Sequence, residues 1–147
     1  MNCEKLVCLI QTDTTVGFSS KSKQKLNQIK NRPLNQEVLI TTAYFFVLKK
    51  ISRVPKKFKK EVRRSKKTTF IYSNNWAIRV VFDLFYRDFL KDFDFLYSTS
   101  ANENKKKFSF DFAFEKADII VIDKRGFFET KASKIFLLGK KKKKRLR

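Results

Sequence analysis

The sequence predicts an α/β protein with a single domain. Seven short apolar runs suited to strands alternate with about five helical patterns, which is typical of a sheet layered against helices. The chain has 147 residues, enough for one hydrophobic core. Its 42% hydrophobic content and 17 Phe residues exclude a disordered basic protein, because such chains are poor in aromatic side chains.

The predicted strands are short apolar runs between turn residues. They cover residues 5–10, 37–41, 68–72, 77–82, 96–98, 117–123 and 134–138. Between the first strand and the first helix, residues 11–20 are rich in Thr and Ser and contain Gly17, so they are predicted to form a turn region.

Capping residues and prolines set the helix boundaries. Ser20 or Ser22 is predicted to cap a first helix. That helix ends near Asn31, because Pro33 pushes the residue before it out of the helical region. The other helices are predicted over residues 43–50 with Thr42 as the cap, from Pro55 as a first helical residue, over residues 86–92 and over residues 111–116.

The net charge of +21 is concentrated in two segments. Residues 49–67 hold eleven basic residues and one acidic residue, and residues 140–147 hold seven basic residues and none that are acidic. Residues 74–139 are nearly neutral. A confined basic segment is the electrostatic footprint of a polyanion site, whereas biased residue usage would explain a general excess of lysine.

The basic helix and the basic tail are candidate RNA contacts. Phe58 and Val62 are four residues apart and face inward, so the helix is expected to contact phosphates rather than bases. A solvated helix face is the alternative. Residues 140–147 are predicted to be a mobile basic tail after a domain over residues 1–139. The predicted RNA-binding residues are Lys56, Lys57, Lys59, Lys60, Arg63 and Arg64.

Several classes of function are excluded by composition. The chain has no histidine, so Ser-His-Asp and Cys-His catalysis and histidine metal sites are ruled out. Two cysteines cannot form a disulfide framework, and no metal site is predicted. The longest apolar run, residues 38–48, is too short to span a bilayer, and no secretory pattern opens the chain. We therefore expect a cytoplasmic protein without a membrane partner.

Four polar segments lie at element boundaries, where open α/β sheets bind ligands. Each alone is an ordinary turn or cap sequence. They are Gln-Thr-Asp-Thr-Thr-Val-Gly-Phe at residues 11–18, Lys-Asn-Arg-Pro at residues 30–33, Ser-Thr-Ser-Ala-Asn at residues 98–102 and Ala-Ser-Lys-Ile at residues 132–135. In order and spacing they resemble the YrdC-like family, the threonylcarbamoyl-AMP synthases, although Gln11 replaces the family's usual proline.

The resemblance implies a twisted, mixed and mostly open sheet flanked by helices. It also implies an enzyme that condenses L-threonine, bicarbonate and ATP into threonylcarbamoyl-AMP and pyrophosphate, for the N6-threonylcarbamoyl modification of adenosine 37 in tRNA. Family members are also described as binding double-stranded RNA and tRNA, so a non-catalytic RNA-binding protein of the same fold is the alternative. A third reading, a small basic ribosome- or DNA-associated protein, predicts that Lys30 and Asn102 lie more than about 15 Å apart.

The resemblance also assigns site residues. Lys30 and Arg32 would be catalytic, because fixed cations stabilise a transferring phosphoryl group and a leaving pyrophosphate. The nucleotide-binding set is Lys30, Arg32, Ser100, Asn102 and Ser133, and the threonine-binding set is Thr12, Thr14 and Arg79. Mg²⁺ would arrive with ATP, bound through its phosphates. For Arg79, a strand-edge ion pair with Asp83 or Asp88 is an equal alternative.

Overall fold

The computed structural model describes residues 3–147 and shows an α/β fold built on one mixed nine-stranded sheet. The strand order is β7-β1-β2-β6-β3-β5-β4-β8-β9. The strands are β1 Cys8–Gln11, β2 Val16–Ser20, β3 Leu39–Thr42, β4 Thr68–Ile71, β5 Ala77–Val80, β6 Leu96–Ser100, β7 Ile119–Val121, β8 Lys134–Leu138 and β9 Lys143–Arg145. The helices are α1 Lys23–Ile29, α2 Phe45–Ile51, α3 Lys59–Arg64, α4 Leu84–Leu90 and α5 Phe110–Lys116, with short 3-10 turns at η1 Cys3–Lys5 and η2 Lys56–Phe58.

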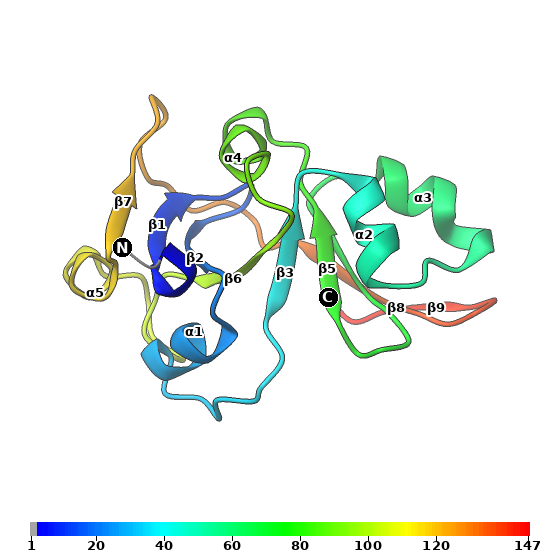
Figure 1. The fold of residues 1–147 in the computed structure, drawn as a ribbon, viewed down its shortest axis with the longest axis horizontal. Coiled ribbons are helices and arrows are strands. Elements are labelled where there is room, and N and C mark those ends of the chain that lie inside the picture. The colour runs from blue at the N-terminus through cyan, green and yellow to red at the C-terminus, as the bar shows by residue number, and fades with distance from the viewer. Residues whose placement is uncertain (1–2) are drawn as a thin grey trace.

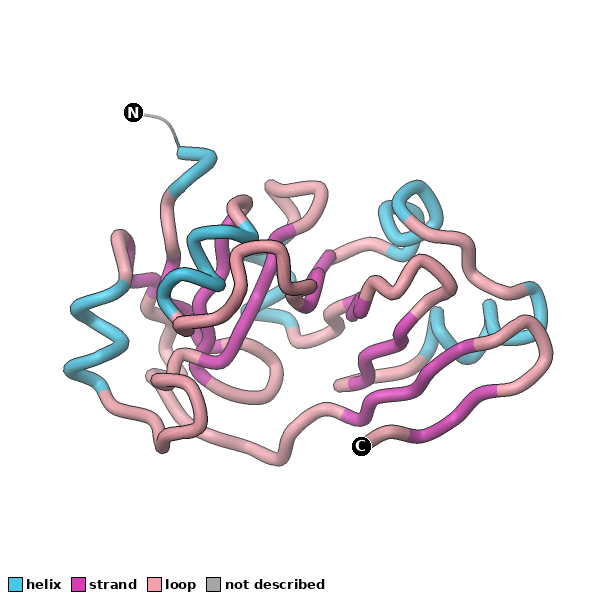
Figure 2. The backbone as a smooth tube through the Cα atoms, turned by 90° about the horizontal axis from the view of Figure 1, so that it is seen from below, coloured by secondary structure: helices cyan, strands magenta, loops and turns pink. Residues whose placement is uncertain are grey.

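The helices cover the two ends of this sheet. In Figure 1, α1 and α5 lie at the end formed by β1, β2 and β7, while α2 and α3 lie at the end formed by β4, β8 and β9. Figure 2 shows the same arrangement from below, with long loops running between the two ends. None of the helices in residues 3–147 has the length and apolar character needed to cross a membrane.

The segment predicted as a turn region contains β2. Only residues 12–15 turn, and the next five residues pair antiparallel with both β1 and β6. All five residues of β2 are buried, including Ser19 and Ser20. The strand therefore lacks the alternation of buried and exposed residues that marks a strand with one face in solvent. Ser19, for example, lies 3.2 Å from the Tyr86 hydroxyl. The polar composition therefore hid a strand that is covered on both faces.

Helix caps agree with the prediction at α1 and differ at α2. The Ser22 side chain accepts a hydrogen bond from the Lys25 amide at 3.2 Å, as a capping serine should. The cap of α2 is Tyr44 and not Thr42. The Thr42 hydroxyl instead donates to the Asp94 carbonyl at 2.8 Å, which holds the end of β3 against the loop before β6.

The basic segment forms a helix as expected, and Phe58 and Val62 are buried. Pro55 precedes η2 and stands one residue outside it, so the continuous helix begins only at α3.

The basic tail is part of the sheet, contrary to the expectation of a mobile end. The β9 strand pairs antiparallel with β8, and the Ile135 amide donates to the Arg147 carbonyl at 3.0 Å. Backbone pairing requires no particular side chain, and all three β9 side chains remain exposed, so these charged residues keep their hydration while β9 forms the edge of the sheet.

Candidate functional site

A cleft of about 530 Å³ opens where the two halves of the sheet meet. Its walls come from the 12–15 turn, β4, β5, β6 and the loop before β8. The polar side chains that line it include Thr12, Thr14, Thr15, Arg32, Glu37, Thr69, Arg79, Ser98, Thr99, Ser100, Glu129, Thr130, Ser133 and Arg147. The cleft thus combines three arginines with a dense set of hydroxyl groups.

Thr12 closes the turn at the floor of this cleft. Its hydroxyl donates to the Thr15 carbonyl at 2.7 Å and accepts from the Thr14 and Thr15 amides, each at 3.2 Å. The Thr14 carbonyl accepts two hydrogen bonds from Thr130, through the amide at 2.8 Å and the hydroxyl at 2.6 Å. The turn is therefore preformed and tied to the loop that precedes β8.

That loop has a second tie at Gln11, the residue that replaces the proline expected from the resemblance. The Gln11 side-chain oxygen accepts from the Phe128 amide at 2.8 Å, and its nitrogen donates to the Thr12 carbonyl at 3.3 Å. A proline could make neither contact, since both belong to the glutamine side chain. The substitution thus fixes the loop against the turn.

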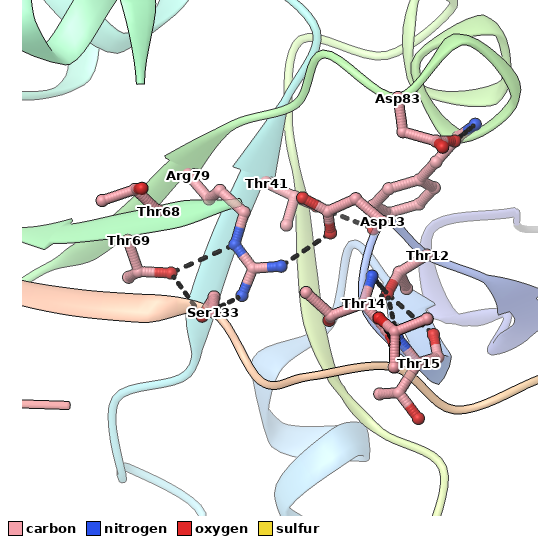
Figure 3. Close-up of polar contacts among 12 residues, drawn as sticks. Thr12, Asp13, Thr14, Thr15, Thr41, Thr68, Thr69, Arg79, Asp83 and Ser133 are labelled. Atoms are coloured by element: carbon pink, nitrogen blue, oxygen red, sulfur yellow. Dashed lines mark hydrogen bonds and ion pairs between the residues drawn. The ribbon is translucent and has the colours of Figure 1, made fainter. Parts of the chain in front are cut away.

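Arg79 is held in a buried ion pair with Asp13, a residue that sequence reasoning did not single out. Its Nη1 donates to Asp13 at 2.7 Å, its Nε to Thr69 at 3.1 Å and its Nη2 to Ser133 at 3.0 Å. Figure 3 shows the guanidinium between these three partners. The expected alternative pairing was wrong: Asp83 pairs with Arg125, and Asp88 pairs with Lys91.

Ser133 lies between two guanidinium groups. Besides Arg79, its hydroxyl accepts from Arg147 Nη2 at 3.0 Å, and its carbonyl accepts from Arg147 Nε at 2.9 Å. Arg147 reaches this position because the β8–β9 hairpin turns the chain back along β8. The only sequence signal for it was a weak match of Leu146-Arg147 to the hydrophobic-Arg ending typical of the YrdC-like family.

Arg32 is the cleft arginine whose guanidinium is left with free donors. Its Nε and Nη2 are buried, and neither has a hydrogen-bond partner in the part of the chain that the structure describes. Burial lowers the pKa of Arg32, but an arginine keeps its charge in proteins. Two unpaired donors on a fixed cation in a cleft are a site for an oxyanion.

Lys30 stands behind the cleft wall. Its ammonium donates to the Ser100 carbonyl at 3.0 Å, to the Asn102 side-chain oxygen at 3.1 Å and to the Asn102 carbonyl. The residue is only 4% exposed. Within residues 3–147, neither Lys30 nor Asn102 is among those that line the cleft, so both hold the turn that presents Ser100.

The structure therefore brings six of the predicted ligand-binding residues together: Thr12, Thr14, Arg32, Arg79, Ser100 and Ser133. Lys30 and Asn102 are in contact, which overturns the reading that required them to lie far apart. Asp13 lies inside the motif at residues 11–18 and Thr69 inside a predicted strand, but no role was assigned to either, and Thr130 lies in a loop outside the four segments.

The predicted RNA-binding residues lie on η2 and α3, outside the cleft. The tail joins them: Lys57 donates to the Lys141 carbonyl at 2.9 Å, and Lys143 forms an ion pair with Glu61. The two basic segments of the sequence thus form one basic surface, defined here as η2, α3 and residues 140–145.

Gly17 is packed too closely for a side chain. A Cβ at this position would lie 2.8 Å from the Thr12 Cγ2 and 3.2 Å from the Thr99 carbonyl. We expect Gly17→Ala to lower the free energy of unfolding by about 1–3 kcal/mol, because a packed site must shift. Urea denaturation measures this. Gly139→Ala, whose Cβ would meet the Lys142 carbonyl at 3.3 Å, is the milder control; equal costs would contradict the prediction.

Lys30 should titrate at unusually low pH. Burial first, and the nearby charge of Arg32 second, lower its pKa from 10.5 to about 8. Between these two pH values the unfolded chain holds the proton and the folded chain does not, so the free energy of unfolding should rise with pH in this window.

Selectively labelled lysine followed by NMR would locate the Lys30 midpoint, with Lys30→Met as the variant that assigns the signal. The variant should also lose the rise in stability between pH 8 and 10.5 that Lys30 produces. A Lys30 midpoint near the ordinary lysine value, or an unchanged pH dependence in Lys30→Met, would contradict the prediction.

Comparison with solved structures relates this fold to known proteins. The crystal structure of P. abyssi Sua5 complexed with L-threonine superimposes with a TM-score of 0.75 and 18% identity, over 98% of this chain and 50% of Sua5. E. coli YciO gives a TM-score of 0.75 and 15% identity over 97% and 82% of the two chains. Full-length HypF in its phosphate- and nucleotide-bound form gives 0.73 and 13%, over 98% and 27%.

The chain spans about half the length of the Sua5 structures it matches. No protein-family model matches the sequence, and no curated protein matches it either. The likeness is thus one of three-dimensional structure, extends over nearly the whole chain and includes the strands that build the cleft. The protein has the fold of the YrdC and Sua5 proteins.

Proposed function

We propose that the protein is an L-threonylcarbamoyladenylate synthase, a nucleotidyltransferase that consumes L-threonine, bicarbonate and ATP. The observation that carries the proposal is Arg32, which lines a cleft rich in hydroxyl groups and has two buried nitrogens without a partner among the described residues. Such a cleft suits a polyphosphate beside a small polar amino acid. The fold it shares with the L-threonine complex of Sua5 adds support.

The proposed chemistry has two steps. The threonine amine attacks the carbon of bicarbonate, and water leaves, which gives a carbamate. A carbamate oxygen then attacks the α-phosphorus of ATP, the bond to the bridging oxygen breaks, and pyrophosphate leaves with its electron pair. Arg32 and Arg147 would stabilise the charge on the transferring and leaving groups, and Ser100 and Ser133 would offer hydroxyl donors.

Threonine would lie against the 12–15 turn. Thr12 and Thr14 line the cleft there, beside Arg79. Because the Arg79 guanidinium already contacts Asp13, Thr69 and Ser133, we propose that it orients this wall of the threonine site.

Mg²⁺ would be held through the phosphates of ATP. Among the described residues, no group of three or more Cys, Asp or Glu side chains could hold a metal ion. The cleft offers the separate carboxylates of Glu37 and Glu129, which suits an ion that keeps most of its ligands as phosphate oxygens and water. Mg²⁺ would neutralise charge on the phosphates.

The test is release of pyrophosphate from ATP by the purified protein. Release should require both threonine and bicarbonate, and omission of either one should abolish it. Arg53→Ala, which removes an exposed arginine outside the cleft, should leave the rate unchanged. Pyrophosphate release that is independent of threonine, or no release at all, would overturn the synthase proposal.

A second candidate function, RNA binding without catalysis, rests on the basic surface. The contacts of Lys57 with the Lys141 carbonyl and of Glu61 with Lys143 bring the two basic segments together, which concentrates positive charge at one end of the molecule. We propose that this surface contacts the phosphates of tRNA or other double-stranded RNA, an interaction weakened by salt.

Charge reversal tests this candidate. Replacing Lys56, Lys57, Lys59 and Lys60 with glutamate should weaken binding of an RNA duplex and flatten its dependence on salt. The matched control reverses Lys105, Lys106 and Lys107, an exposed basic run that lies outside η2, α3 and the tail. Equal effects of the two reversals, or no effect of the first, would refute a role for the basic surface.

A further inference from the structure

Two aromatic side chains stack on the protein surface where β3 passes into α2. The Tyr44 and Phe46 rings have centroids 5.1 Å apart and are tilted by 22°, so they are stacked. Phe46 is 53% exposed. Its neighbour Phe45 instead packs against the buried cluster that contains Leu48 and Val54. The core therefore uses one of two adjacent phenylalanines and leaves the other in solvent.

Cations surround this stacked pair. The Lys50 ammonium lies 5.5 Å from the centre of the Phe46 ring, and the Arg87 guanidinium lies 5.8 Å from the centre of the Tyr44 ring. Lys50 is exposed on α2, whereas Arg87 comes from α4. Two separate elements thus each place a cation over one ring of the pair.

The basic surface contacts the same helix, α2, through Phe45, which is next to Phe46 in the chain. Arg63 of α3 lies 4.8 Å from the centre of the Phe45 ring, and Lys49 lies 5.7 Å from it. The start of α2 therefore has cation–aromatic contacts with α4 through Tyr44 and with α3 through Phe45. The ligand should be negatively charged, because the stacked pair lies next to the most basic part of the chain.

We propose that Tyr44 and Phe46 form a stacking platform for unpaired bases of a single-stranded polynucleotide. Bases have an aromatic face whatever their identity, and exposed aromatic rings bordered by cations are how proteins hold single strands. Lys50 and Arg87 would contact the phosphates on either side of the stacked base. The bases of a duplex are already stacked on one another, so a duplex would use the basic surface alone.

The basic helix itself provides no exposed ring. Phe58 is buried, as predicted, and gives that helix no ring to offer a base. The aromatic component comes from α2, which the sequence showed only as a short apolar helix. The helix α2 therefore offers both a ring and a cation, while η2 and α3 offer cations alone.

Fluorescence anisotropy with labelled 12-nucleotide oligouridine and oligothymidine tests the proposal. Phe46→Ala should weaken binding of the single strand about five-fold or more, and Phe46→Trp should retain it. The variant removes no charge, so the salt dependence should stay as in wild type. Phe114→Ala, which removes a ring of similar exposure on α5, is the matched control and should bind like wild type. The RNA and DNA arms decide which sugar is preferred.

The Phe46→Trp variant supplies an independent readout. Stacking of a base on the indole should quench its fluorescence as the oligonucleotide is added. Wild-type affinity in Phe46→Ala, or binding to Phe46→Trp without quenching, would overturn the platform. Competition by an acidic peptide that depends on Phe46 would overturn it in favour of a protein partner. Binding of both the single strand and a duplex that is independent of Phe46 would leave the RNA-binding candidate standing while the platform fails.

Discussion

Replacing Asp13 with alanine should destabilise the protein by about 3–5 kcal/mol, the cost of leaving one member of a buried ion pair without its partner. The Arg79 and Asp13 side chains are 6% and 3% exposed and lie 2.7 Å apart. Without the carboxylate, the guanidinium keeps its charge and cannot reach bulk water. Chemical denaturation of the wild type and the variant gives the difference in the free energy of unfolding.

Two further variants separate the energy of the buried pair from the general effect of losing an aspartate. Adding Arg79→Met to Asp13→Ala should recover much of the lost stability, because the double variant no longer buries an uncompensated charge. Asp88→Ala removes the partner of Lys91 from an ion pair whose aspartate side chain is 72% exposed, and we expect it to cost less than about 1 kcal/mol. Similar losses in Asp13→Ala and Asp88→Ala would show that the buried pair carries no special energy.

Arg32→Ala should lower kcat/KM for threonine-dependent pyrophosphate release by roughly 10²–10³-fold, the usual effect of removing a fixed donor from developing charge. Stability should change little, since the Nε and Nη2 donors have no partner to lose among the described residues. The steady-state rate and the denaturation midpoint together separate a role in the reaction from a role in the fold.

Arg32→Lys is the informative companion. A lysine keeps the positive charge and lacks the planar fork, so it should fall between wild type and Arg32→Ala if two donors act together. Isothermal titration with ATP gives a second measurement that does not depend on turnover. Loss of activity with unchanged ATP binding would move Arg32 from the phosphates to the threonine carboxylate. Unchanged activity in Arg32→Ala would contradict its assignment.

Local signals were enough to predict much of the fold. A capping serine, a proline after a helix and short β-branched runs each act over a few residues, so Ser22 and Pro33 bounded α1 and the predicted strands overlap those observed. Elements defined by tertiary pairing were missed. The β2 strand ends in two serines that its neighbours bury, and the lysine-rich β9 joins the sheet through its backbone, so neither has the local pattern of a strand.

In the candidate site too, the sequence indicated residues of local motifs and missed contacts between distant segments. Motif order indicated Thr12, Arg32 and Ser133, and all three line the cleft. The pairing of Arg79 with Asp13 joins residues 66 positions apart, so the motif at residues 11–18 contained that aspartate without showing its partner. The resemblance assigned Lys30 to catalysis and to the nucleotide, whereas in the structure its ammonium contacts Ser100 and Asn102. A lysine in a motif indicates a charge, but only the fold shows whether that charge meets a ligand or the carbonyls of a neighbouring turn.

The course of the chain after β9 has a practical consequence for every assay described above. Arg147 donates to Ser133 inside the cleft, and its carbonyl accepts from the Ile135 amide. An affinity tag or fusion partner joined after residue 147 would therefore emerge at the mouth of the cleft and compete with substrate for the same space. Preparations tagged at the other end avoid this, and a comparison of the two would show how far a following segment obstructs access.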